Sequence, residues 1–116
     1  IVVAVGDEYS NMTTGTNKAV FRMPFAMTVR SVRASVVTAP TGSVATWDIN
    51  DGGTTILSTK LTIDASEKTS TTAAAAAVIS DTALADDAEI SIDRDGVGST
   101  IAGAGDKITI CGAKDI

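Results

Sequence analysis

The segment Trp47-Asp48-Ile49-Asn50, closed by the turn Asp51-Gly52-Gly53, decides the fold class. Apolar and polar residues alternate in it, so that its two apolar side chains point to one side of an extended chain and its two polar ones to the other. The same pattern returns in Ile90-Ser91-Ile92-Asp93. A period of two predicts β-strands that have one face in a core and the other toward solvent or a partner.

Outward from these two segments, apolar stretches bounded by turn residues occupy most of the chain. They are residues 1–5, 18–23, 27–38, 43–50, 54–63, 69–79, 88–94 and 107–111. The separators are rich in Gly, Pro and Asp and leave no room for a crossover helix, so neighbouring strands should be antiparallel. About eight short strands at this spacing are typical of a sandwich. With 116 residues, the chain should form one all-β domain, 1–116, an antiparallel β-sandwich.

Two irregularities in the pattern predict local bends. Met27 and Val29 share one parity whereas Val32 and Ala34 have the other, which predicts a β-bulge or a strand bend near Arg30-Ser31. Pro24 cannot donate to a ladder, so it should mark a bend or an edge.

Three segments are less regular. Thr69–Ile79 contains five consecutive alanines, which favour a helix, but so short a helix is marginal in isolation and we expect an extended strand of small side chains. Ser80–Asp87 offers an N-cap and could form one helical turn. Gly103-Ala104-Gly105 lacks the setting of a nucleotide-binding loop and is predicted to be a hairpin turn.

The composition narrows the chemistry that the chain can perform. Nine Lys and Arg against fourteen Asp and Glu give a net charge of −5, which disfavours nucleic acid as a partner. There is no histidine, hence no imidazole base or metal ligand, and nothing that would activate the many Ser and Thr hydroxyls. We therefore predict that the protein is not an enzyme and that it has no catalytic residue, metal or cofactor.

Cys111 is the single cysteine, so an internal disulfide is excluded. It lies in an alternating run, where we expect a small buried hydrophobe; an inter-chain disulfide is the alternative. No apolar run approaches the roughly 18 residues of a membrane span, and no signal peptide is evident. Because the chain begins with Ile1, we expect a processed protein or a piece of a longer one.

Two acidic loops could hold calcium through their oxygen atoms. Asp48 and Asp51 stand before a pair of glycines, and Asp93 and Asp95 precede Gly96. Neither loop has EF-hand spacing, and Asp residues also serve turns and solvated faces, so the sequence predicts no metal site and leaves cation binding at these pairs open.

Positive charge is concentrated in the first third of the chain, at Arg22, Arg30 and Arg33. The simplest interpretation is a solvated face. The alternative is complementary charge at a subunit contact, which would set orientation more than affinity.

Several stretches together resemble a module found in structural proteins of tailed bacteriophages. They are Phe21–Val29 with Val32–Ser35, Thr38–Gly42, Trp47–Gly53, Ile56–Asp64, Leu84–Asp93 and the turn Val97–Thr100. The resemblance covers nearly the whole domain. It implies a jelly-roll sandwich that commonly trimerises and lies on the virion surface, in a tail fibre or as a capsid decoration protein. It also implies other virion proteins as partners, with a host-surface glycan or protein as a further partner, and no catalytic residues.

Two rival functions make specific structural demands. A carbohydrate-binding module, with or without calcium, would need Trp47 or Tyr9 exposed as a stacking platform and Asp93 or Asp95 as ligands. An enzyme would need a cleft that gathers Asp48, Asp93 and Arg94.

Overall fold

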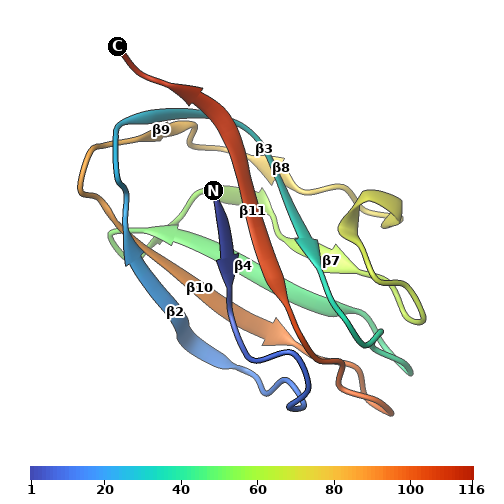
Figure 1. Cartoon of the computed structure of the whole chain (residues 1–116). Helices are drawn as coiled ribbons and strands as arrows, with labels where there is room; N and C mark the ends of the chain where they lie inside the picture. The colour runs from blue at the N-terminus through green and yellow to red at the C-terminus, as the bar shows by residue number, and fades with distance from the viewer.

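The computed structural model describes all residues, 1–116, and consists of antiparallel strands in two main layers (Figure 1). The four-stranded sheet has the order β1 (Val2–Ala4), β11 (Lys107–Lys114), β3 (Met27–Ser35), β9 (Ala83–Leu84). The five-stranded sheet has the order β2 (Gly15–Arg22), β10 (Glu89–Gly96), β4 (Ala45–Asp51), β5 (Thr54–Thr55), and β7 (Leu61–Ile63) also pairs with β4. A two-stranded sheet joins β6 (Leu57–Thr59) to β8 (Val78–Ile79), and one 3-10 turn, η1, spans Ser70–Thr72.

The path of the chain between the layers is that of a jelly roll. From β1 to β4 every connection crosses from one sheet to the other, and the chain crosses back to reach β9, β10 and β11. This arrangement places the first and last strands side by side, as in double Greek-key sandwiches. The predicted fold class is therefore confirmed. Pro24 lies in the bend between β2 and β3, where the chain changes sheets, as its missing N–H predicted.

The core lies between the two sheets and consists mainly of aliphatic side chains. On the central strands β4 and β10, Trp47, Ile49, Ile90 and Ile92 are fully buried, which confirms the predicted alternation. The polar residues between them were expected to face solvent or a partner. Asp48, Asn50 and Ser91 are instead 6–7% exposed, because they lie in the middle of the sheet and are covered by neighbouring side chains.

The predicted bulge in β3 is present. Ser31 pairs with Cys111 and Val29 pairs with Gly112, so that Arg30 is the extra residue on β3. Arg30 and Ser31 are consecutive and both exposed, which interrupts the alternation. As a result Val29 and Ala34, which have opposite parity, both lie on the buried face. The strand stays within one sheet on both sides of the bulge.

The expectation of a strand over 69–79 was wrong for most of that segment. The Thr69 hydroxyl caps η1 by accepting a hydrogen bond from the Thr71 amide, and the Asp64 carboxylate accepts one from the Ala74 amide at 2.9 Å. These local bonds compete with a sheet ladder, and only Val78 and Ile79 pair as a strand.

Two further local predictions were wrong because a distant strand decides the structure. The segment 80–87 forms no helical turn; Ala83 and Leu84 form β9 against Thr28 and Met27 of β3. Residues 103–105 do not close a hairpin, because β10 and β11 belong to different sheets. Ala104 bridges to Asn11 and Thr38 instead, and Gly103 and Gly105 take φ values of 100° and 73° on either side of it. The structure contains no helix with the length and hydrophobicity of a membrane span.

Candidate functional site

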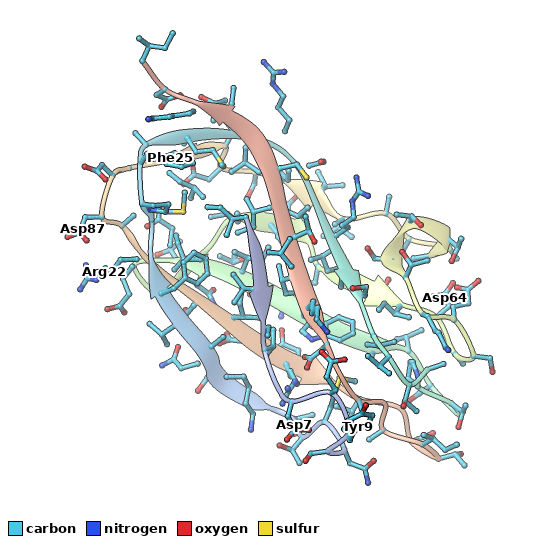
Figure 2. The ribbon with its side chains drawn as sticks, in the orientation of Figure 1. Asp7, Tyr9, Arg22, Phe25, Asp64 and Asp87 are labelled. Atoms are coloured by element: carbon cyan, nitrogen blue, oxygen red, sulfur yellow. The ribbon has the colours of Figure 1, made fainter.

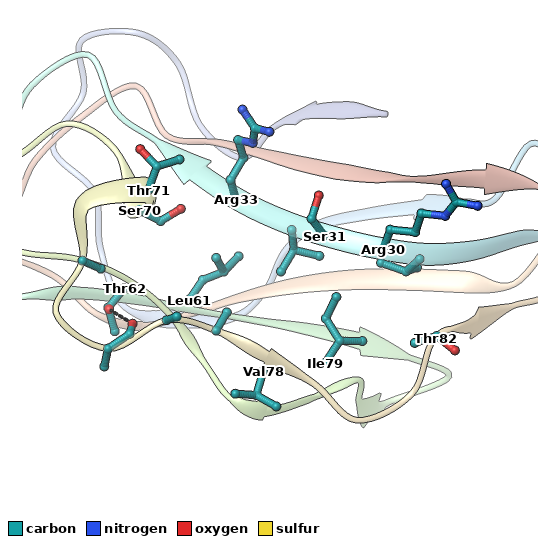
Figure 3. Close-up of a pocket in the computed structure, with 16 residues that line it drawn as sticks. Arg30, Ser31, Arg33, Leu61, Thr62, Ser70, Thr71, Val78, Ile79 and Thr82 are labelled. Atoms are coloured by element: carbon teal, nitrogen blue, oxygen red, sulfur yellow. Dashed lines mark hydrogen bonds between the residues drawn. The ribbon is translucent and has the colours of Figure 1, made fainter.

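The largest hollow of the molecule is a groove of about 610 Å³ along the outer edge of β3. One wall is β3 from Val29 to Arg33, and the other is the segment 73–79, which contains the alanine run and β8. Leu61 of β7 lies between them, as Figure 3 shows. We call this hollow the β3 groove.

The β3 groove exists because the edge of the four-stranded sheet is covered only at its two ends. At one end β9 pairs with Met27 and Thr28, and the Val29 amide donates to the Thr82 carbonyl at 2.8 Å. At the other end the Ala34 amide donates to Ser70 Oγ at 2.9 Å. Between these ends, Arg30–Arg33 faces the alanine run, whose short side chains leave the space open.

Val32 presents an unpaired backbone N–H and carbonyl to the β3 groove. Its partner on β11 is Ile110, whose own N–H and carbonyl are used on the opposite side, in bonds of 2.8 and 2.9 Å to Ile1. In an antiparallel ladder, two opposite residues either exchange both backbone hydrogen bonds or direct their N–H and carbonyl groups away from each other. Because Ile110 directs its groups away from Val32, Val32 also directs its own groups away from Ile110. Ala34, two residues on, shows this direction by its bond to Ser70, whereas no hydrogen bond from outside the strand ladders reaches Val32.

The charge around the β3 groove is opposite to that of the chain as a whole. Arg30 and Arg33 line it, both are exposed, and neither forms an ion pair, whereas no Asp or Glu is among the lining residues. Figure 3 shows both guanidinium groups rising from β3 on the side away from Leu61 and Ile79. The groove therefore combines an apolar interior, a free strand edge and a cationic rim.

Arg22 does not join this charge. It lies on β2, in the other sheet, and its Nη2 is 3.5 Å from Glu89 Oε2. Its Nη1 donates to the Asp87 carbonyl, and Figure 2 shows these two residues on the opposite side of the view from Asp64. The three arginines therefore do not form one group. Arg30 and Arg33 lie together on β3, whereas Arg22 forms a separate ion pair at the surface of the other sheet.

Three of the four carboxylates considered for calcium, Asp48, Asp93 and Asp95, bind groups of the protein itself. Asp48 accepts from the Thr55 hydroxyl at 2.5 Å and from the Ile49 amide, and Asp93 accepts from the Asn50 side chain at 3.0 Å. Asp95 pairs with Lys60 at 2.6 Å, and this hydrogen bond raises the pKa of the Lys60 amine. Asp51 is half-buried at the end of β4. No three acidic, His or Cys residues form a cluster suited to a metal ion.

The structure meets one demand of the rival functions, an exposed Tyr9, but buries Trp47 and separates Arg94 from Asp48 and Asp93. Trp47 is fully buried and cannot stack on a sugar, whereas Tyr9 is 87% exposed on the loop after β1 (Figure 2). Asp48 and Asp93 are register neighbours on the outer face of their sheet. Arg94 follows Asp93 on β10 and pairs across to Trp47, so it points to the other face.

A buried ionic cluster around Asp106 and Arg94 was not predicted from the sequence. Asp106 is fully buried and accepts two hydrogen bonds from Arg94, Nε to Oδ2 at 2.7 Å and Nη2 to Oδ1 at 2.8 Å. Trp47 Nε1 also donates to its Oδ2, at 2.8 Å, and Arg94 Nη1 reaches the Thr13 carbonyl. The cluster ties β4 and β10 to the loops before β2 and β11, so its role is structural. The only indication of this cluster in the sequence is that Arg94 has the same parity as Ile90 and Ile92, which point into the core.

Cys111 is a free thiol and is half-buried, so it is less enclosed than predicted. It lines a second, shallower hollow of about 390 Å³ near Ile1, Phe25 and Met27.

Comparison with family models, curated proteins and solved structures finds no match to this chain.

Proposed function

We propose that this protein is a structural module exposed on the surface of a tailed-bacteriophage particle, where it acts through contacts with other proteins. The resemblance to such modules supports the virion assignment; it includes Phe21–Val29, Val32–Ser35, Trp47–Gly53 and Ile56–Asp64. The jelly roll is compatible with it, since viral capsid proteins use this fold, but the fold hosts other functions too.

The β3 groove is the observation that favours protein contact over chemistry. A free strand edge beside an apolar hollow offers what another polypeptide can use, namely backbone hydrogen bonds and pockets for side chains. Two buried carboxylates elsewhere are engaged within the fold, Asp106 by Arg94 and Asp48 by Thr55. Capsid decoration and a tail-fibre position both fit this proposal.

Particles of the phage that encodes the chain provide the direct test. We expect mass spectrometry of gradient-purified particles to detect the chain, and gold-labelled antibodies against it to mark intact particles in electron micrographs. The position of the gold, on heads or on tails, would separate decoration from tail fibre. Absence of the chain from particles in which the other virion proteins are detected would refute the proposal.

A homotrimer is expected in solution, on the basis of the resemblance. Size-exclusion chromatography with light scattering should give a mass three times the 11.7 kDa of one chain, unchanged on dilution through the micromolar range. A mass equal to one chain across that range would contradict the trimer, while leaving a particle-bound monomer to be tested separately.

A further inference from the structure

We propose that the β3 groove accepts an extended, acidic segment of a partner protein, which pairs with the free edge at Val32 as an added strand. This inference builds on the proposed function by naming the chemistry of a partner. Three independent features of the groove carry it: backbone groups, interior shape and charge.

The backbone groups call for a strand. Antiparallel β-sheets satisfy edge groups by pairing, and exposed edges are commonly protected by charge, proline or a covering element. In the four-stranded sheet, β9 covers β3 only at Met27 and Thr28. A guest segment that continues the line of β9 would meet Val32, donate to its carbonyl and accept from its N–H. The uncovered stretch Arg30–Arg33 fits a guest strand of about four residues, since a strand rises about 3.3 Å per residue.

The interior of the groove suits small or medium aliphatic side chains. The floor is formed by Leu61, which is 2% exposed, and Val29, which is likewise 2% exposed, with Ile79 and the alanine run beside them. Alternate residues of a guest strand would point into this space and displace water from it. The pocket has no buried charge to which an inward polar side chain could bind.

The rim selects for acidic residues on the outward face of the guest. Arg30 and Arg33 have no carboxylate partner, whereas Arg22, Lys60, Arg94 and Lys107 each have one. A guanidinium group recognises a carboxylate through two parallel hydrogen bonds. An alternating guest, acidic outside and aliphatic inside, therefore complements both the rim and the floor.

A synthetic pentapeptide tests the inference on the purified chain. The probe is acetyl-Asp-Val-Ala-Val-Asp-amide, compared with its lysine counterpart, acetyl-Lys-Val-Ala-Val-Lys-amide. In ¹⁵N NMR titrations we expect the acidic probe to shift the amide of Val32 and those of its neighbours in the groove, and the lysine peptide to bind at least about tenfold more weakly. Methylation of the peptide nitrogen that donates to the Val32 carbonyl removes that hydrogen bond and should weaken binding about tenfold. Methylation of the next nitrogen in the peptide, which points away from β3, should leave binding unchanged.

Matched protein variants separate the rim from overall charge. Arg30→Gln with Arg33→Gln should weaken the acidic probe about fivefold. Lys18→Gln with Arg22→Gln removes the same charge from β2 and should leave the affinity unchanged. The inference would be overturned by equal binding of both peptides, by equal loss in both double variants, or by no shift at millimolar probe. Concentration-dependent shifts at the groove without any probe would identify a second copy as the occupant and also overturn it. Because no phage particle is used, these outcomes are independent of the virion test.

Discussion

Replacing Asp106 with asparagine is expected to lower the free energy of unfolding by about 3–5 kcal/mol. The carboxylate is fully buried and accepts hydrogen bonds from Arg94 through both of its oxygens, while Arg94 itself is 7% exposed. The amide keeps the size of the side chain but removes its negative charge. The guanidinium group then remains buried with no opposite charge, and its desolvation is no longer compensated.

Urea denaturation followed by far-UV circular dichroism measures this loss. Glu8→Gln is the control, because Glu8 also pairs with a cation, Lys107, at 2.5 Å, but at the surface, where the two side chains are 49% and 33% exposed. The control should lose less than about 1 kcal/mol. A loss at Asp106 no larger than at Glu8 would mean that the buried pair contributes little to holding the two sheets and their loops together.

The parts of the fold that the sequence predicted are those where local pattern and global packing agree. The alternation in β4 and β10 placed Trp47, Ile49, Ile90 and Ile92 correctly in the core. The change of parity in β3 located the bulge, because an extra residue must shift every later side chain to the other face. Pro24 marked the bend for a similarly local reason, the absence of an N–H.

The errors lie where a distant segment decides between weak local preferences. Ala83 and Leu84 become a strand because the edge of β3 is beside them, not because of their own propensity. The helix preference of the alanine run was too weak to prevail: the Ala74 amide donates to the Asp64 carboxylate, and Ser70, just before the run, accepts from the Ala34 amide of β3. No pattern indicated which sheet each strand joins, so the loop at 103–105 was mistaken for a hairpin.

The candidate site illustrates the same limit. The sequence signals of the β3 groove are the positive charge of Arg30 and Arg33 and the small side chains of the alanine run, and neither indicates a free strand edge. The free edge at Val32 depends on β9 beginning only at Ala83, opposite Thr28, and on Ser70 of η1 bonding to β3 only at Ala34. Both are matters of where distant strands stop pairing. The acidic loops are candidate calcium ligands in the sequence because carboxylates are frequent there, yet Asp48 and Asp93 form hydrogen bonds with Thr55 and Asn50.

Replacing Trp47 with alanine should destabilise the protein by about 3–5 kcal/mol, since the largest side chain of the core is fully buried and its removal leaves a cavity. Tyr9→Ala is the matched control, an aromatic ring that is 87% exposed, and should change stability by less than about 0.5 kcal/mol. Far-UV circular dichroism is the measurement, because the variant has no tryptophan fluorescence. Equal stability of the two variants would contradict the position of Trp47 in the core.

Trp47→Phe helps to separate the two contributions of this residue, because it removes the hydrogen bond from Nε1 to Asp106 but keeps much of the ring volume. We expect a loss smaller than that of Trp47→Ala. In a double-mutant cycle with Asp106→Asn, the two changes should be non-additive by about 0.5–3 kcal/mol. Additivity would mean that the indole stabilises the fold by packing alone. Coupling would mean that one carboxylate joins the centre of the five-stranded sheet to the loop that carries the chain into β11, and so helps to fix the jelly roll.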